Sequence, residues 1–154
     1  MRTLTQWLTE YGQSHRNAFN ERVHFVCVPA IVLSVLGLLS SVPIPRMWAG
    51  IWGLNWATLF AACALIYYCC LSWSLAAGIF VCFAVMLAIV HLLQALPLPL
   101  WATSLVIFVV AWIGQAIGHA IEGKRPSFFK DVQFLLIGPL WLLAAAYQRL
   151  GLTY

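Results

Sequence analysis

The sequence predicts an all-α integral membrane protein, a polytopic bundle of four to five transmembrane helices preceded by a short interfacial helix. Hydrophobic residues make up 64% of the 154 positions and charged residues only 8%, whereas a soluble domain is about one quarter charged. Apolar runs of about 20 residues, long enough to cross a bilayer, recur along the chain. The links between them are too short for a second domain, so residues 1–154 are predicted to form a single transmembrane helical domain.

Four apolar runs have the length of a transmembrane helix. They cover residues 25–42, 47–71, 73–93 and 100–118. A fifth, residues 132–147, is shorter and contains Gly138-Pro139, and it can cross the bilayer, re-enter it or lie along the interface. Proline cannot continue a helix interior, so the segments 42–46 and 96–101 are predicted turns on one side of the membrane.

The segment before the first span is predicted to form a short amphipathic helix over residues 4–14. Its apolar face consists of Leu4, Trp7, Leu8 and Tyr11. Such a helix lies along a membrane surface. Asn17 and Asn20 interrupt it, and we expect Asn20 to cap a new helix that continues into the first span.

The distribution of basic residues predicts the orientation. Three precede the first span (Arg2, Arg16, Arg22) and three follow the fourth (Lys124, Arg125, Lys130). Four crossings bring both groups to one face, which the positive-inside rule makes cytoplasmic. A net charge of +4 without a basic stripe argues against a nucleic-acid partner.

Three of the four histidines are expected to meet at this cytoplasmic face. His15 and His24 are nine residues apart, about 900° of helix, so they converge only if the chain bends between them. The break at residues 17–20 supplies that bend. His91 lies near the far end of the third span and is excluded.

His119 lies at the cytoplasmic end of the fourth span. Gln115, His119 and Glu122 follow a spacing of four and three residues, so they share one stripe of the helix. Three neutral imidazoles with a nearby carboxylate suit Fe(II) or Zn(II). The alternative for each histidine is an interfacial side chain bonded to a backbone carbonyl.

Two patterns connect these residues to a known family. They are YxxxHxxxxNxxxHxxxxP over residues 11–29 and WxxQxxGHxxExxxP over residues 112–126, followed by Gly138-Pro139. With the layout of the spans, they resemble the fungal 2-hydroxy fatty acid dioxygenase family. This family has many bacterial members, so the resemblance makes a bacterial inner membrane the expected location. The resemblance covers nearly the whole chain, although Cys27 stands where a glycine is common in the family.

The resemblance implies an Fe(II)-dependent membrane enzyme that uses O2 to shorten a 2-hydroxy fatty acid by one carbon. It makes His15, His24 and His119 the expected iron ligands. Glu122 would be a fourth ligand or the acceptor for an imidazole N–H. Three protein ligands leave room on an octahedral ion for O2 and for the substrate's carboxylate and hydroxyl, which favours the second role for Glu122.

Other polar residues near the histidines have two interpretations each. Gln115 and Asn20 can orient a histidine or the substrate, or make structural hydrogen bonds. The basic residues Arg22, Lys124 and Arg125 can attract a fatty acid carboxylate, or they can set topology and contact lipid headgroups. Tyr11 can shape the site or anchor its helix at the interface.

Two other function classes stay open at this stage. A non-catalytic lipid-binding protein or small transporter subunit would use the histidines structurally. A Zn(II)-dependent membrane hydrolase would share the ligands without needing O2. The sequence leaves the acyl-chain length and the oligomeric state undetermined.

Overall fold

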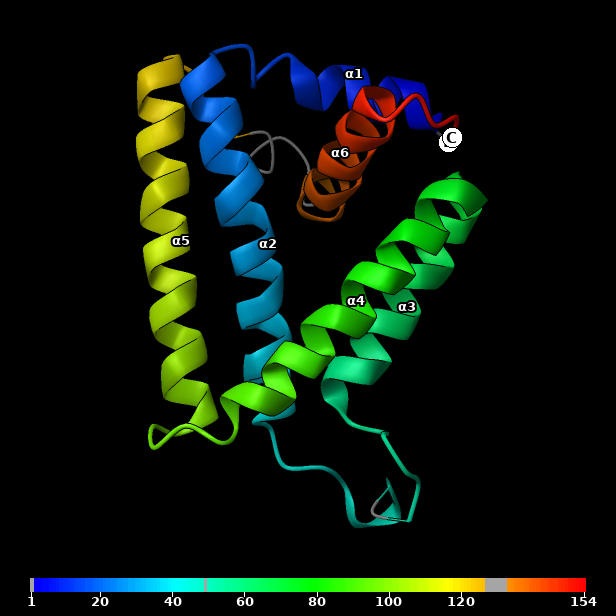
Figure 1. Ribbon diagram of the computed structural model, residues 1–154, viewed down its shortest axis with the longest axis vertical. Helices are drawn as coiled ribbons and strands as arrows, with labels where there is room; N and C mark the ends of the chain where they lie inside the picture. Colours follow the sequence, from blue (N-terminus) through cyan, green and yellow to red (C-terminus); the bar gives the residue numbers. More distant parts are fainter. Residues whose placement is uncertain (1, 49, 127–132) are drawn as a thin grey trace.

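The computed structural model describes residues 2–48, 50–126 and 133–154. Six α-helices and one short 3-10 helix make up this part of the chain, which holds no β-strand (Figure 1). The helices long and apolar enough to span a membrane are α2 (Ala18–Ser40), α4 (Trp73–Leu93) and α5 (Leu100–Glu122). Only 17–28% of the most apolar stretch of each is buried, so much of their apolar surface needs a lipid cover. The fold is a helical membrane bundle, as predicted.

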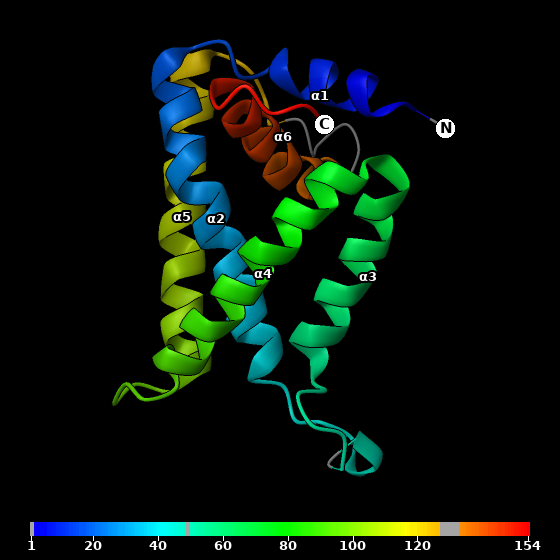
Figure 2. The same cartoon turned by 45° about the vertical axis from the view of Figure 1, so that its right-hand side comes forward.

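The helix α1 (Leu4–Gly12) lies across one end of the bundle (Figures 1 and 2). A capping box starts it, in which the side chains of Thr3 and Gln6 each accept a hydrogen bond from the other's backbone N–H. Trp7 and Tyr11 are buried on its inner face. The predicted amphipathic helix is therefore confirmed, although it ends at residue 12 rather than 14.

The helix α2 begins at residue 18, three residues before the start that a cap at Asn20 would give and seven before the predicted span. Its N-cap is Asn17, whose side-chain oxygen accepts a hydrogen bond from the backbone N–H of Phe19 at 2.9 Å. The prediction that Asn20 caps this helix is wrong, because Asn20 lies within the first turn and is completely buried. Either asparagine can cap a helix, and the choice of Asn17 leaves the Asn20 side chain available for other contacts.

The prediction of a helix over residues 47–71 is wrong in its first part. A short 3-10 helix, η1 (Arg46–Trp48), and turns precede α3 (Trp56–Leu71). Gly53 has a φ of 75°, and the Asn55 side chain accepts hydrogen bonds from the first N–H groups of α3. The 16 residues of α3 rise about 24 Å, less than the roughly 30 Å of a hydrocarbon core.

The helix α4 matches its predicted bounds, and α5 continues four residues beyond the predicted 118. Gly123, with a φ of 70°, ends α5 in the left-handed conformation typical of a helix terminus. The α2–α3 and α4–α5 links both lie at the end of the bundle opposite α1 (Figure 1), as predicted from their prolines. The extra turn of α5 brings Glu122 to the α1 end.

The helices α2 and α5 pack side by side along most of their length (Figures 1 and 2). Glycines allow this close approach: an added Cβ at Gly37, Gly114 or Gly118 would collide with Ser104 Oγ, Cys27 Sγ or Asn20 Oδ1, respectively. Small residues four apart commonly bring membrane helices together. The side chain of Cys27 fits because its neighbour on α5 is a glycine.

The helix α6 (Phe134–Arg149) begins and ends near the α1 end of the bundle (Figures 1 and 2). Its first residue, Phe134, packs against Trp7 of α1 with ring centroids 5.1 Å apart. Its last residue, Arg149, forms an ion pair of 3.1 Å with Glu21 in the first turn of α2. Among the courses left open for residues 132–147, re-entry and a course along the interface both fit this arrangement; residue 132 lies outside the described ranges.

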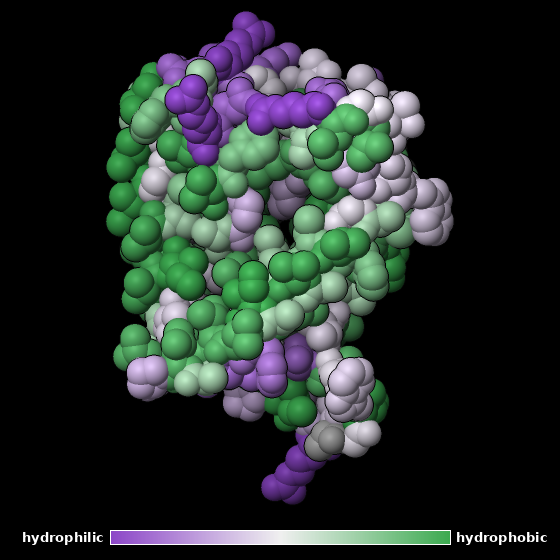
Figure 3. Space-filling model, in the orientation of Figure 1, coloured by the Kyte–Doolittle hydropathy of each residue, from purple (hydrophilic) through white to green (hydrophobic). Residues whose placement is uncertain are grey.

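The polar surface gathers at the same end. Figure 3 shows most of the strongly hydrophilic surface of this face beside α1, above an apolar body. Of the seven lysines and arginines that the structure describes, only Arg46 lies at the opposite end. Lys130 belongs to the ranges left undescribed. Both chain termini lie near α1 (Figures 1 and 2).

Candidate metal centre

His15 lies in the loop between α1 and α2, where Tyr11 fixes its ring in two ways. The Tyr11 backbone carbonyl accepts a hydrogen bond from His15 Nδ1 at 2.7 Å. The Tyr11 ring stacks on the imidazole with centroids 4.2 Å apart and an angle of 13° between the planes. Burial lowers the pKa of His15 to about 4, so the ring is neutral near pH 7.

His24 lies on the second turn of α2 and is 2% exposed. The backbone carbonyl of Asn20, one turn earlier, accepts a hydrogen bond from His24 Nδ1 at 2.9 Å. A carbonyl oxygen can only accept, so Nδ1 must be the protonated nitrogen in both His15 and His24. In each neutral ring, Nε2 is then left with an unprotonated lone pair.

These two lone pairs face each other. The Nε2 atoms of His15 and His24 are 2.8 Å apart, and the rings lie nearly edge to face. Two unprotonated nitrogens at this distance repel unless a proton or a metal cation lies between or beside them. Because burial disfavours a charged His15 ring, a metal cation is the better fit for this pair.

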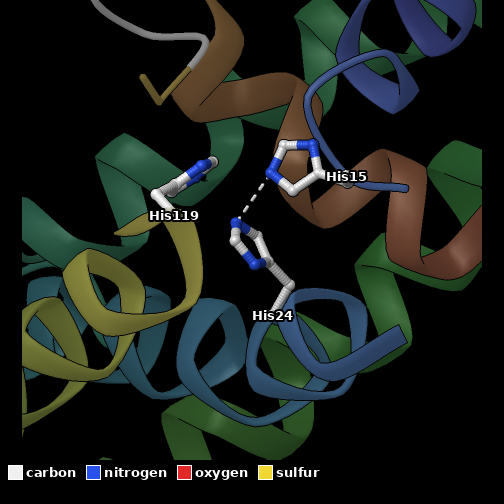
Figure 4. A group of neighbouring side chains, drawn as sticks. All are labelled: His15, His24 and His119. Carbon is white, nitrogen blue, oxygen red and sulfur yellow. Dashed lines mark hydrogen bonds between the residues drawn. The ribbon is translucent and has the colours of Figure 1, made fainter. Parts of the chain in front are cut away.

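His119 approaches the pair from the last turns of α5. Its ring centroid lies 5.0 Å from that of His15 and 5.0 Å from that of His24. Each of the three histidines offers a nitrogen within 4.8 Å of the others. Figure 4 shows the three rings turned toward a common space. The predicted convergence of these histidines at one end of the bundle is what the structure shows.

The three histidines have the chemistry and spacing of a metal site. Two nitrogens bound at right angles to one ion, at about 2.0–2.1 Å, lie about 2.9 Å apart, close to the observed separation of 2.8 Å. His119 Nδ1 is buried and finds no hydrogen-bond partner in the described part of the chain, as expected for a nitrogen that a cation would satisfy. Three buried imidazoles thus form a site that can hold a divalent metal ion.

The carboxylate of Glu122 has hydrogen-bond partners that the sequence did not predict. Its carboxylate accepts hydrogen bonds from the backbone N–H groups of Arg16 at 3.0 Å and Asn17 at 2.7 Å. The Asn20 side chain donates a third, longer bond of 3.4 Å. The carboxylate therefore binds the loop that carries His15, and it accepts no imidazole N–H among the bonds that the structure describes.

Two further contacts hold the same loop. The Asn20 side-chain amide donates to the Ser14 carbonyl at 3.3 Å, and Lys124 Nζ donates to the Gln13 carbonyl at 2.6 Å. Residues from α2 and from the end of α5 thus fix the loop from both sides. Asn20 and Glu122 position His15 through its backbone.

A pocket of about 60 Å³ adjoins the three histidines. Beyond the histidines, its lining is mostly apolar and comes from α2, α5 and α6, including Val28, Val32 and Leu135. Gln115 also lines it and is 5% exposed. The amide nitrogen of Gln115 is buried and makes no hydrogen bond to any residue that the structure describes.

The three basic residues predicted to attract substrate lie outside this pocket. Arg22, Lys124 and Arg125 are exposed and absent from the lining. His91, excluded from the cluster on the basis of the sequence, is exposed near the far end of α4.

Two aromatic residues of α6 belong to the site and were not singled out from the sequence. Trp141 lies 5.6 Å from the His15 ring, centroid to centroid, and Phe134 lines the pocket. Both belong to an apolar run in which they resemble any other packing residue. Only the folding of α6 back against α1 places them here.

The fold and the site define a helical membrane protein with a buried three-histidine site of the metal-binding type. A family model described as 2-hydroxy-palmitic acid dioxygenase Mpo1-like matches residues 1–150, and the chain belongs to this family. The resemblance noted from the sequence patterns is thereby confirmed. No curated protein and no solved structure matches the chain.

Proposed function

We propose that this protein is a membrane-embedded, non-haem Fe(II) dioxygenase that shortens 2-hydroxy fatty acids by one carbon. The observation that supports it most is the pair of facing Nε2 lone pairs on His15 and His24, with His119 beside them. Membership of a family whose description names a 2-hydroxy-palmitic acid dioxygenase supports the substrate class.

The overall reaction balances with O2 as the only oxidant. The bond between the carboxyl carbon and C2 breaks, C2 becomes the carboxyl carbon of the shorter acid, and the former carboxyl carbon leaves as CO2. C2 loses three electrons and the carboxyl carbon loses one, and these four electrons reduce O2. One oxygen atom enters the shortened acid and the other leaves in water, so no external reductant is required.

In this proposal His15, His24 and His119 hold the iron. Bound Fe(II) supplies a Lewis acid for the substrate's carboxylate and hydroxyl, and the redox chemistry that O2 requires. Three protein ligands leave enough positions for this chemistry, and Glu122 is engaged with the backbone of the His15 loop.

Around the metal, Gln115 is the residue best placed to orient the substrate. Its buried amide N–H groups can donate to a carboxylate or hydroxyl oxygen in the pocket, which would remove the cost of leaving them unpaired. Arg22, Lys124 and Arg125 would act at longer range, by raising the concentration of anionic lipid near the entrance.

The site would lie at the cytoplasmic boundary of the membrane. This orientation rests on the excess of basic residues at the α1 end and on the positive-inside rule. A fatty acid could then present its polar head to the metal while its acyl chain stays among apolar helices, and the inner membrane of a bacterium would be the location.

The test is turnover by protein purified under anaerobic conditions and loaded with Fe(II) or Zn(II). With Fe(II), we expect 2-hydroxyhexadecanoic acid to give the acid one carbon shorter, with equal amounts of O2 consumed and CO2 released. Zinc-loaded protein should consume no O2. Cleavage of a lipid ester by zinc-loaded protein, with no O2 consumed, would indicate a hydrolase, and no product from protein with a full iron content would support a non-catalytic lipid-binding role.

A further inference from the structure

A second cavity lies next to the metal pocket and is lined in part by the same residues of α2. It has a volume of about 220 Å³ and lies between α2, α4 and α6. Figure 3 shows a hollow in the apolar surface where, in Figure 1, these three helices meet. Val28 and Val32 line both this cavity and the metal pocket, so the two spaces share one wall.

The gap between the helices has local causes. Pro29 of α2 and Pro139 of α6 both line it, and an internal proline removes a helix hydrogen bond and bends the chain. Toward the α1 end the gap is closed, because α4 and α6 approach closely at Gly78, where an added Cβ would lie 2.5 Å from the Tyr147 hydroxyl. Along α2 the lining of the cavity extends from Phe25, next to His24, to Val32.

The lining of this cavity selects a hydrocarbon occupant. Every side chain that the structure places on it is apolar, including Ile79, Cys82, Phe83 and Met86 of α4 and Ala146 of α6. A polar ligand would leave its hydrogen-bonding groups unpaired there. From His24 to Val32 the distance along α2 is about 12 Å, a length that part of an acyl chain can cover.

We propose that the acyl chain of the substrate runs past Val28 and Val32 into the cavity between α2, α4 and α6, which thereby sets the accepted chain length. This inference rests on the proposed function, because it takes the polar head of the same molecule to lie at the three histidines. The wall shared by the two spaces is what favours the substrate's own chain over an unrelated membrane lipid.

The first test changes the size of the cavity. Cys82→Phe places an aromatic ring in it, whereas Ala84→Phe places the same ring on the exposed side of the same helix. We expect Cys82→Phe to lower the ratio of kcat/KM for 2-hydroxyhexadecanoic acid to that for 2-hydroxydecanoic acid by about tenfold or more, the scale of discrimination by pocket shape. Ala84→Phe should leave this ratio unchanged, and Met86→Ala should shift it toward longer chains.

The second test locates the chain without requiring turnover. A 2-hydroxyhexadecanoic acid with a photoreactive diazirine near its methyl end is irradiated with the protein in nanodiscs, and the labelled residues are mapped by mass spectrometry. We expect the label on Cys82, Phe83 or Met86, with competition by the unmodified acid. Val106 and Val110, exposed on α5, report labelling from the surrounding lipid.

The outcomes separate this inference from the proposed function. Turnover with label spread equally over the cavity and α5 would overturn the acyl-chain site and leave the proposed function standing. Competed label in the cavity without turnover by iron-loaded protein would overturn the proposed function and retain the cavity as a lipid site. An unchanged chain-length ratio in Cys82→Phe would also contradict the inference.

Discussion

The Nε2 atoms of His15 and His24 lie 2.8 Å apart, although both rings already donate their Nδ1 protons to backbone carbonyls. The backbone thus determines which nitrogen of each ring stays unprotonated, and it aims both lone pairs at the same point. In metalloproteins, a carbonyl that accepts from the far nitrogen of a ligating histidine fixes both tautomer and ring orientation. This relationship is the basis for the predictions that follow.

Gln115 should affect substrate binding more than metal binding. We expect Gln115→Leu to raise the KM for a 2-hydroxy fatty acid about tenfold, the effect of losing one hydrogen bond to a charged group. Iron content should stay unchanged, and stability should not fall, because the amide nitrogen makes no hydrogen bond to the described residues. A loss of iron equal to the loss of activity would show instead that Gln115 supports the metal site.

Glu122 should affect the metal through the His15 loop. Glu122→Ala removes the acceptor for the N–H groups of Arg16 and Asn17, and we expect iron affinity to fall by about 10–100-fold, as for other residues that position ligands. Affinity can be measured by competition with a chelator of known strength.

The matched control is Glu21→Ala, which removes a carboxylate that pairs with Arg149 at a partly exposed site. Pairs of this kind contribute little, so iron affinity should stay at the wild-type level. Equal effects of the two substitutions would mean that Glu122 acts only through its charge.

The contact between α2 and α5 should respond to side-chain volume at Gly114. A Cβ added there would lie 2.6 Å from Cys27 Sγ, and overpacking of this kind costs about 1–3 kcal/mol. We expect Gly114→Ala to lower the free energy of unfolding in mixed micelles, and Cys27→Ala to restore most of the loss in the double variant. Strictly additive effects would contradict a direct contact between the two residues.

Because both ends of α6 lie near the α1 end of the bundle, we expect both termini on the same side of the membrane, which the positive-inside rule makes the cytoplasmic side. A fluorescent protein fused after Tyr154 should therefore fluoresce, and alkaline phosphatase fused there should be inactive. Fusions in the α4–α5 link, after Leu98, should show the opposite pattern. An active phosphatase at the C-terminus would mean that α6 crosses the membrane.

Much of this arrangement could be predicted from the sequence, because it depends on the direction of the spans. Apolar runs without charge predicted the helices. The alternating direction of successive spans predicted that His15, His24 and His119 lie at one end of the bundle and that His91 does not. The start of α3 could not be predicted in this way. Met47, Ile51 and Trp52 continue the apolar composition, while the chain turns at Gly53, and an averaged hydropathy does not register such a turn.

The role of Glu122 depended on tertiary contacts that no local pattern shows. Its place on the stripe of His119 suggested a ligand or the partner of a ligand, but its hydrogen-bond partners are backbone N–H groups more than 100 residues away in sequence. The choice between Asn17 and Asn20 as the cap of α2 was equally ambiguous, since both residue types and positions suit a cap. The structure shows that the Asn20 side chain is buried against α5 near Gly118, which leaves Asn17 as the cap.

The central claim is that the three buried histidines bind one metal ion, and elemental analysis of anaerobically purified protein tests it most directly. We predict close to one iron per chain in the wild type and in His91→Ala, and almost none in His24→Ala, with a monodisperse elution profile showing that each variant is folded. The account would be contradicted if wild-type protein held no iron after loading with Fe(II). It would also be contradicted if His24→Ala and His91→Ala lost iron equally.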